Sequence, residues 1–179
     1  MTPALARGLT AREIIWCGLG ANIPPVDPGP QIGETLGSYR LQRIIGRGGM
    51  GQVFLAEHIR LAKQAAEKVL APHLAADPVY RSRFLTEARL LSEVDAPGIV
   101  QVMDVLEQDE PARIAFVMEY IEGPPLRKVL EKTRLSPQQA AQLGLQLIAA
   151  LESIHERNVV HRDIKPSNLI LDGFITESH

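Results

Sequence analysis

The sequence has little from which covalent cross-links, nucleic-acid contacts or a membrane span are built. Of its 179 residues only Cys17 is a cysteine, which excludes an internal disulfide framework and a cysteine-based metal cluster. The formal net charge of -2 provides no basic surface for nucleic acid or an anionic membrane. The uncharged apolar run over residues 14–23 is too short to cross a bilayer, and no signal peptide is recognised. We therefore expect a cytoplasmic protein with no nucleic-acid partner.

Apolar residues make up 45% of the sequence, enough to form a hydrophobic core. Residues 1–37 are expected to be a flexible, Pro/Gly-rich N-terminal extension, because prolines and glycines interrupt regular structure between residues 24 and 33. Within it, Thr10 and Glu13 have the spacing of a capping box, which predicts a short helix over Thr10–Trp16.

The most informative stretch is the polar loop His161–Asn168, which lies between two apolar runs. Such flanking strands hold a reactive loop rigidly. Asp163 can accept a proton from a hydroxyl group, and Lys165 can sit near a transferring phosphoryl group. Asn168 can offer its carbonyl oxygen to a hard cation such as Mg²⁺. A charged surface hairpin without chemistry is the alternative interpretation of the same residues.

A second motif is the glycine-rich stretch Gly46, Gly48 and Gly51, followed by Val53. Glycines at this spacing let backbone N–H groups approach phosphate oxygens closely, since no Cβ intervenes. A dinucleotide-binding turn would require a helix after the glycines, whereas the residues after Gly51 predict a strand. A phosphate-binding hairpin is therefore favoured, and an ordinary glycine hairpin is the alternative.

The next strand is predicted over Gln64–Leu70. Alternation places Ala66 and Lys68 on one face and Glu67 on the other. A Glu67 carboxylate that faced the interior would be costly unless it were paired or exposed.

Two capped helices follow in the sequence. Asp77 as N-cap with proline at the first helical position predicts a helix to about Glu93, with Glu87 beside its apolar stripe. Ser136 begins a second capping box, and the helix after it, to about Arg157, has leucines at helical spacing.

Taken in order, these motifs resemble those of protein kinases. The loop matches the pattern H-R-D-x-K-x-x-N, and the glycine stretch matches G-x-G-x-x-G-x-V. The resemblance covers about Tyr39 to Leu171. Lys165 resembles the catalytic-loop lysine of serine/threonine kinases and not the corresponding position of tyrosine kinases, and the stretch GRGGMGQVFLAEH resembles bacterial members of the family. It implies an α+β, protein-kinase-like fold, in which an antiparallel small-lobe sheet with one helix joins the first part of a helical large lobe.

The resemblance also implies roles for individual residues. Lys68 would bind the α- and β-phosphates of ATP and pair with Glu87, while Ala66 would lie under the adenine. Gly46, Gly48, Gly51 and Val53 would cover the nucleotide. The backbone of Glu119 and Ile121 would hydrogen-bond the adenine edge. Within the partial kinase domain at 38–179, the implied ranges are a small lobe at about 38–118, a hinge at about 119–124 and the start of the large lobe at about 125–179.

The implied function is that of an ATP- and Mg²⁺-dependent protein serine/threonine kinase, with Asp163 and Lys165 catalytic and Asn168 a metal ligand. The D-F-G and A-P-E motifs of the family do not occur in the sequence given, so we expect this polypeptide alone to transfer little phosphate. A non-catalytic nucleotide- or partner-binding pseudokinase fragment is the alternative. A truncated chain would also leave the helix bearing Leu143, Leu147 and Leu151 uncovered, which predicts self-association.

Overall fold

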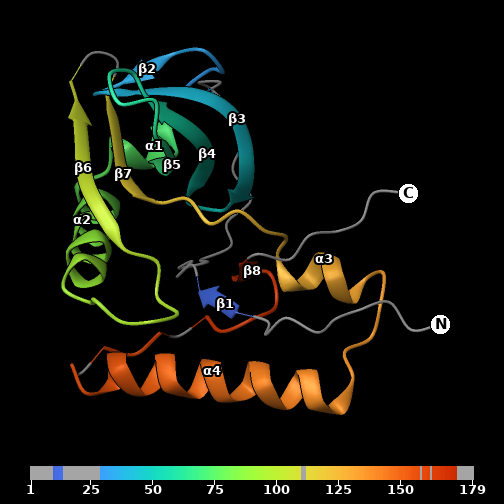
Figure 1. The fold of residues 1–179 in the computed structure, drawn as a ribbon. Coiled ribbons are helices and arrows are strands. Elements are labelled where there is room, and N and C mark those ends of the chain that lie inside the picture. The colour runs from blue at the N-terminus through green and yellow to red at the C-terminus, as the bar shows by residue number, and fades with distance from the viewer. Residues whose placement is uncertain (1–9, 14–28, 110–111, 158, 162, 173–179) are drawn as a thin grey trace. The chain divides into compact units, whose positions relative to one another are not determined.

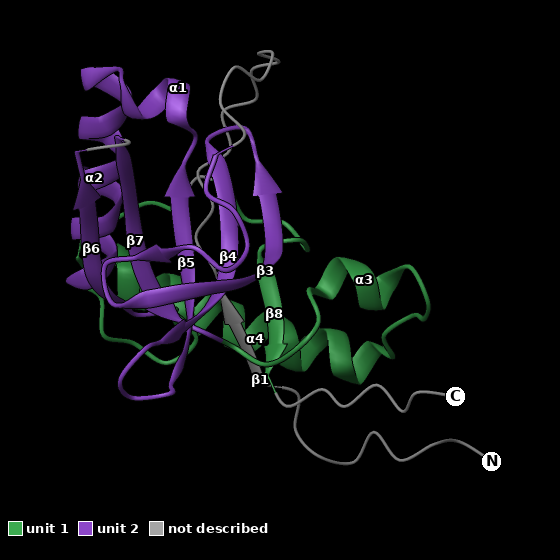
Figure 2. Ribbon diagram, turned by 90° about the horizontal axis from the view of Figure 1, so that it is seen from above, with its two compact units in different colours: residues 1–16, 94–100, 121–179 green, residues 17–93, 101–120 purple. Residues whose placement is uncertain are grey.

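The computed structural model describes residues 29–109, 112–157, 159–161 and 163–172, together with the backbone of residues 10–13. Contacts within the chain divide it into two compact units (Figure 2). The sheet unit comprises residues 17–93 and 101–120, and the helical unit comprises residues 1–16, 94–100 and 121–179. The chain last passes from one to the other between Tyr120 and Ile121, inside the segment predicted as a hinge.

The sheet unit is built on one antiparallel sheet, as predicted for a small lobe (Figure 1). The strands lie in the order β2-β3-β4-β5-β7-β6. Their bounds are Thr35–Leu36 for β2, Tyr39–Gly48 for β3, Gly51–His58 for β4, Gln64–Leu70 for β5, Val102–Gln108 for β6 and Arg113–Glu119 for β7. Register shifts in β3, between Leu41 and Arg43 and between Ile44 and Gly46, bend this strand.

The first strand of this sheet begins earlier than the sequence indicated. The strand β2 pairs with β3 in the register Thr35 to Arg40, and Leu36 is 4% exposed within a core that includes Leu41 and Phe54. Residues 35–36 therefore belong to the packed sheet and not to a flexible extension. A two-residue strand is too short to show a hydrophobic period, which is why the sequence did not reveal it.

The described residues of the sheet unit include the helices α1 (Pro72–Ala75) and α2 (Pro78–Ser92). The predicted cap of α2 is present, because the Asp77 side chain accepts a hydrogen bond of 2.8 Å from the Val79 N–H. On the buried side of α2, Phe84 packs against Phe116 of β7 with ring centroids 4.9 Å apart. This contact helps fix the helix that carries Glu87.

The helical unit contains α3 (Leu126–Leu130) and α4 (Pro137–His155), with the strands β1 (Thr10–Glu13) and β8 (Leu169–Asp172). The capping box predicted at Ser136 is complete, since Gln139 N–H donates to its hydroxyl and the Gln139 side chain accepts from its N–H. In the described part of the chain, no helix is both long and apolar enough to cross a membrane.

The apolar stripe of α4 is buried at Leu143 and partly buried at Leu147 and Leu151, contrary to our expectation of a bare face. Leu143 is buried with Leu126 and Val129 of α3 and with β8, and Leu147 packs against the same cluster. Leu151 packs against a second cluster of buried residues, which includes Val94 and Ile99 of the segment 94–100. The cover comes from segments far from α4 in the sequence, which periodicity within the helix could not reveal.

The exposed apolar residues of α4 are different ones, Leu145 at 67% and Ile148 at 62% exposure. The predicted stripe is therefore not the most exposed apolar part of this helix.

The short helix predicted over Thr10–Trp16 is wrong where the structure describes it. Residues Thr10–Glu13 form β1, antiparallel to β8, and residues 14–16 lie outside the described residues. Pairing with β8 outweighs the local capping signature, as tertiary context often does for short segments.

Candidate functional site

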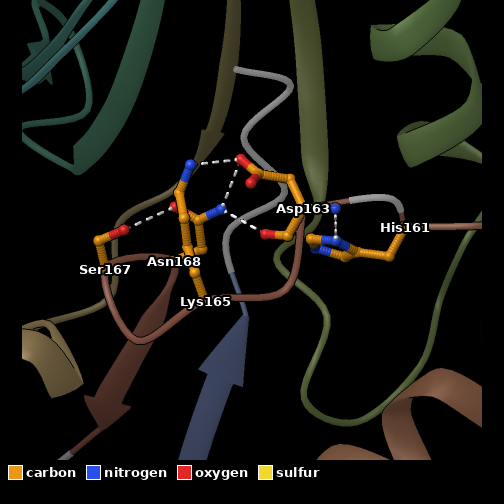
Figure 3. Close-up of polar contacts among 5 residues, drawn as sticks. All are labelled: His161, Asp163, Lys165, Ser167 and Asn168. Carbon is orange, nitrogen blue, oxygen red and sulfur yellow. Dashed lines mark hydrogen bonds and ion pairs between the residues drawn. The ribbon is translucent and has the colours of Figure 1, made fainter. Parts of the chain in front are cut away.

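The loop His161–Asn168 brings its predicted acid, lysine and amide together (Figure 3). The Oδ2 atom of Asp163 lies 2.6 Å from Lys165 Nζ and accepts a second hydrogen bond of 3.2 Å from Asn168 Nδ2. Asn168 Nδ2 also donates to the backbone carbonyl of Asp163 at 2.7 Å. One carboxylate oxygen is therefore fixed by two donors, while the loop backbone is held by the same amide.

Backbone hydrogen bonds within the helical unit tie the loop to α3 and stabilise the loop internally. The carbonyl of Pro166 accepts from the N–H of Arg127, at the start of α3, at 2.9 Å. Asn168 N–H donates to the carbonyl of Lys165, also at 2.9 Å, and Asn168 is only 2% exposed. These bonds hold the amide in place before any ligand arrives.

His161 is a positioning residue to which sequence reasoning gave no role. It is 3% exposed, and its Nδ1 accepts the backbone N–H of Asp163 at 3.1 Å. Burial lowers the pKa of His161, against the opposite effect of the Asp163 carboxylate. A neutral imidazole keeps Nδ1 as an acceptor, so the shift favours the observed bond. Its place two residues before Asp163 was the available signal.

The surroundings of Asp163 favour its ionised form. Burial raises its pKa, but the hydrogen bonds from Lys165 and Asn168 and the charges of Lys165 and His161 lower it by more. The pKa of the Asp163 carboxyl therefore lies below its usual range. At neutral pH the group is a carboxylate that can orient a hydroxyl donor.

The second predicted set lies in the sheet unit, where Lys68 and Glu87 form the expected ion pair. Lys68 Nζ lies 2.6 Å from Glu87 Oε1, and the two side chains are 5% and 12% exposed. The ammonium also stands 5.1 Å from the ring centroid of Phe116 and 5.6 Å from that of Phe84. The cation is thus held in a largely apolar setting, where its charge is weakly screened.

Glu67, next to Lys68 in β5, is the residue whose burial was expected from the sequence to be unfavourable. It is fully buried, and neither carboxylate oxygen has a hydrogen-bond partner. Burial raises the pKa of Glu67 from its ordinary 4.5 to about 8, so the group is mostly protonated at neutral pH. Its effect reaches Tyr39, whose pKa is raised by burial, by Asp104 and by Glu67.

The glycine-rich stretch is a hairpin, as predicted. Gly48 pairs with Gly51 across a turn at residues 49–50, and Gly46 pairs with Val53. At Gly51, φ is +151° and an added Cβ would lie 2.0 Å from the carbonyl oxygen of Val69. Glycine is therefore required at Gly51 by the close approach of β5.

The residues predicted to contact adenine lie where β5 and β7 meet and at the passage between the units. Ala66 is fully buried and pairs with Met118 of β7. The N–H of Glu119 donates to the carbonyl of Gln101 at 3.0 Å, so an adenine contact by Glu119 falls to its carbonyl oxygen. Ile121 is 6% exposed.

For the implied cation, the donor chemistry at Asn168 fits. Its Nδ2 is committed to Asp163, while Oδ1 lies 3.4 Å from Ser167 Oγ, a long hydrogen bond. An amide oxygen of this kind is a ligand type that Mg²⁺ accepts. Among the described residues there is no cluster of three or more His, Cys, Asp or Glu side chains suited to a metal ion. The structure thus places the Lys68–Glu87 pair and the glycine hairpin in the sheet unit, and the Asp163, Lys165 and Asn168 cluster in the helical unit, which also contains Ile121.

Comparison with known proteins places this geometry in context. A family model described as "Protein kinase domain" matches residues 39–176. The chain is 43% identical over 147 residues to serine/threonine-protein kinase PknA of Mycobacterium tuberculosis, and 39% identical over 143 residues to PrkC of Bacillus subtilis. Each match covers 79% of this chain, but only 34% of PknA and 22% of PrkC. The chain therefore spans about a third or less of these relatives.

A solved structure of a protein kinase domain has a similar fold. The crystal structure of the M. tuberculosis PknI kinase domain matches with a TM-score of 0.68 at 28% identity. The match covers 82% of this chain and 59% of that one.

Proposed function

Because this chain belongs to the protein kinase family, with bacterial serine/threonine kinases among its relatives, we propose that its site serves transfer of the γ-phosphoryl group of ATP to a serine or threonine hydroxyl of a protein substrate. The observation that carries the proposal is the Asp163 carboxylate, fixed by Lys165 at 2.6 Å and by Asn168 at 3.2 Å. Positioning and charge neutralisation supply most of the catalysis of phosphoryl transfer.

In this proposal Asp163 orients the acceptor hydroxyl and takes its proton as the oxygen–phosphorus bond forms. A carboxylate of lowered pKa is ionised at neutral pH, so it is ready to accept the hydroxyl hydrogen bond. Lys165, 44% exposed at its side chain, is free to turn from Asp163 toward the negative phosphoryl oxygens. The bond between the two side chains then holds the pair in place before substrate binds.

Most of the nucleotide contacts would come from residues of the sheet unit. Lys68, held by Glu87, would neutralise the α- and β-phosphates. The glycine hairpin would cover the phosphates, with Gly46, Gly48, Gly51 and Val53 as its contacts. Ala66 and the backbone of Glu119 and Ile121 would contact the adenine. Asn168 would offer Oδ1 to Mg²⁺, which when bound neutralises phosphate charge.

Nucleotide binding and phosphate transfer are tested separately on the 179-residue polypeptide. Thermal unfolding is followed with millimolar ATP, with and without Mg²⁺. Incorporation of labelled phosphate into a serine/threonine peptide library is measured in parallel. Lys68→Met is compared with Lys132→Met, which removes an exposed lysine just after α3, and Asp163→Asn is the catalytic variant.

We expect Mg²⁺-dependent stabilisation by ATP that is lost in Lys68→Met and kept in Lys132→Met and Asp163→Asn. Any incorporation should fall by at least about 100-fold in Asp163→Asn. The absence of stabilisation by ATP in the unaltered chain would overturn the proposal. Because the sequence given contains neither D-F-G nor A-P-E, little incorporation is expected from the unaltered polypeptide, and ATP binding is the deciding measurement. Incorporation that Asp163→Asn leaves unchanged would also overturn the proposal.

The finer predictions from the sequence remain open to test. These are the lobe and hinge ranges, a cytoplasmic location, and self-association through α4, for which the exposed Leu145 and Ile148 are candidate contacts.

A further inference from the structure

Strand β8 is paired along one edge by the segment that leads into α3. Leu171 donates its backbone N–H to the carbonyl of Pro124 at 3.1 Å, and Ile170 forms a bridge with Pro125. The two backbones approach so closely that a Cβ on Gly123 would lie 2.0 Å from the carbonyl oxygen of Leu171. This edge of β8 is therefore closed by backbone contacts.

The opposite edge of β8 is closed by β1, which comes from the far end of the sequence (Figure 1). Thr10 lies opposite Asp172, and the pairing continues to the position of Leu169. Successive N–H groups in a strand point to opposite edges. Since the N–H of Leu171 points to Pro124, those of Ile170 and Asp172 point to β1.

The sequence of β1 is poorly suited to a strand. Alanine and glutamate are depleted in strands, and Thr10 with Glu13 has the signature of a helix start. Such a conflict between local preference and observed structure indicates a segment held by its partner. The strand conformation of β1 is therefore imposed by the edge of β8.

Pairing at this edge of β8 affects the backbone directly after the His161–Asn168 loop. The strand begins at Leu169, directly after Asn168, and Leu169, Ile170 and Leu171 are all buried. Buried backbone groups require partners. Without β1, the outward N–H groups of Ile170 and Asp172 would lose theirs at the end of the loop that holds Asp163.

We propose that β8 presents a strand-binding edge and that Thr10–Glu13 is its occupant, a segment that braces the end of the His161–Asn168 loop through backbone pairing. Recognition by main-chain hydrogen bonds is tolerant of side chain, so the edge suits any short extended peptide of matching length. The inference concerns residues 10–13, to which the proposed function gives no role, and its test does not require ATP.

The register supplies a matched pair of variants. Arg12 lies opposite Ile170, so its N–H points toward β8, whereas Ala11 lies opposite Leu171 and its N–H points away. Arg12→Pro removes a ladder donor, and Ala11→Pro introduces the same ring without removing one. Arg12→Ala keeps the N–H and removes only the side chain.

The readout is amide hydrogen exchange in the full chain, resolved by residue. We expect Arg12→Pro to speed exchange at Ile170 and Asp172 by at least about tenfold. The Leu171 amide, bonded to Pro124, should change much less, and Ala11→Pro and Arg12→Ala should resemble the unaltered chain. A synthetic peptide of residues 8–15, added to the Arg12→Pro chain, should restore protection, and the same peptide with proline at position 12 should not.

Either of two kinds of result, from the variants or from dilution, would overturn the inference. The first is unchanged exchange at Ile170 and Asp172 in Arg12→Pro, or equal acceleration in Ala11→Pro. The second is protection in the unaltered chain that falls on dilution, because β1 would then be supplied by a second copy and not by the same chain.

Discussion

The ammonium of Lys68 lies 2.6 Å from the carboxylate of Glu87, and both side chains are nearly excluded from solvent at 5% and 12% exposure. Glu67, the residue before Lys68 in β5, is buried as well, but neither of its carboxylate oxygens has a hydrogen-bond partner. Two acidic groups in one unit thus meet opposite conditions, one neutralised by a cation and the other by a proton.

The ion pair predicts a large cost for removing one partner. Glu87→Ala should lower the free energy of unfolding by about 3 kcal/mol, because the Lys68 charge stays buried without this carboxylate. Urea unfolding measures the change. The matched control is Glu131→Ala, which breaks an exposed pair with Arg127 on α3 and should cost less than about 1 kcal/mol. Equal effects of the two substitutions would show that burial does not set the cost.

Glu67 predicts a stability that falls as pH rises. Its pKa is 4.5 when unfolded and about 8 when folded, so between these values the folded chain keeps a proton that the unfolded chain has released. Stability from this group is therefore full below pH 4.5 and is lost as pH rises through about 8, at up to about 1.4 kcal/mol per pH unit.

Glu67→Met should remove that slope and raise the free energy of unfolding at pH 8 by several times RT, since no carboxyl is left to bury. Glu93→Met, at an exposed position just after α2, is the control and should keep the slope. Chemical unfolding at pH 5, 6.5 and 8 gives the comparison. A Glu67→Met chain with an unaltered pH profile would contradict a buried, protonated Glu67.

We expect the contact with Lys165 to lower the pKa of the Asp163 carboxyl. Lys165→Met removes the 2.6 Å hydrogen bond and a nearby positive charge, so the pKa of the Asp163 carboxyl should rise toward its usual range. NMR titration of the carboxyl carbon measures this shift. Lys132→Met should leave it unchanged. A constant Asp163 pKa in Lys165→Met would mean that the pair does not persist in solution.

Alanine substitutions at Gly51 and Gly144 should change the free energy of unfolding in opposite directions. Gly51→Ala should lower the free energy of unfolding by more than about 1 kcal/mol, because the new Cβ would meet the Val69 carbonyl at 2.0 Å in a backbone conformation of φ +151°. Gly144→Ala, within α4 and with nothing within 4 Å, should raise it by up to about 1 kcal/mol. Both changes are measured by thermal and urea unfolding, and destabilisation by Gly144→Ala would contradict the open space described there.

Much of the fold could be predicted because its signals are local. The caps at Asp77 and Ser136 involve residues at most three positions apart, so the sequence places the starts of α2 and α4 directly. The loop from His161 to Asn168 is equally compact, and all the contacts of Asp163 described above lie within it.

Two of the predictions that were wrong concern contacts between segments far apart in the sequence. The cover over Leu143 comes from α3 and β8, and the strand conformation of Thr10–Glu13 comes from pairing with residues 169–172. Neither partner is near in the sequence, so neither the helix stripe nor the capping signature contained the necessary information. Contacts formed across a long stretch of chain depend on where the whole backbone runs.

The sequence by itself determined which residues could do chemistry, since the type and spacing of Asp163, Lys165 and Asn168 follow directly from the order of amino acids. It also determined that Glu67 would be costly if buried, because a carboxyl group in an apolar core needs a partner. The tertiary structure decided that Glu67 has none and that Lys68 has Glu87. It also decided that a helix-like segment at Thr10 lies as a strand, because only the folded chain sets which remote groups meet and which are shielded from water.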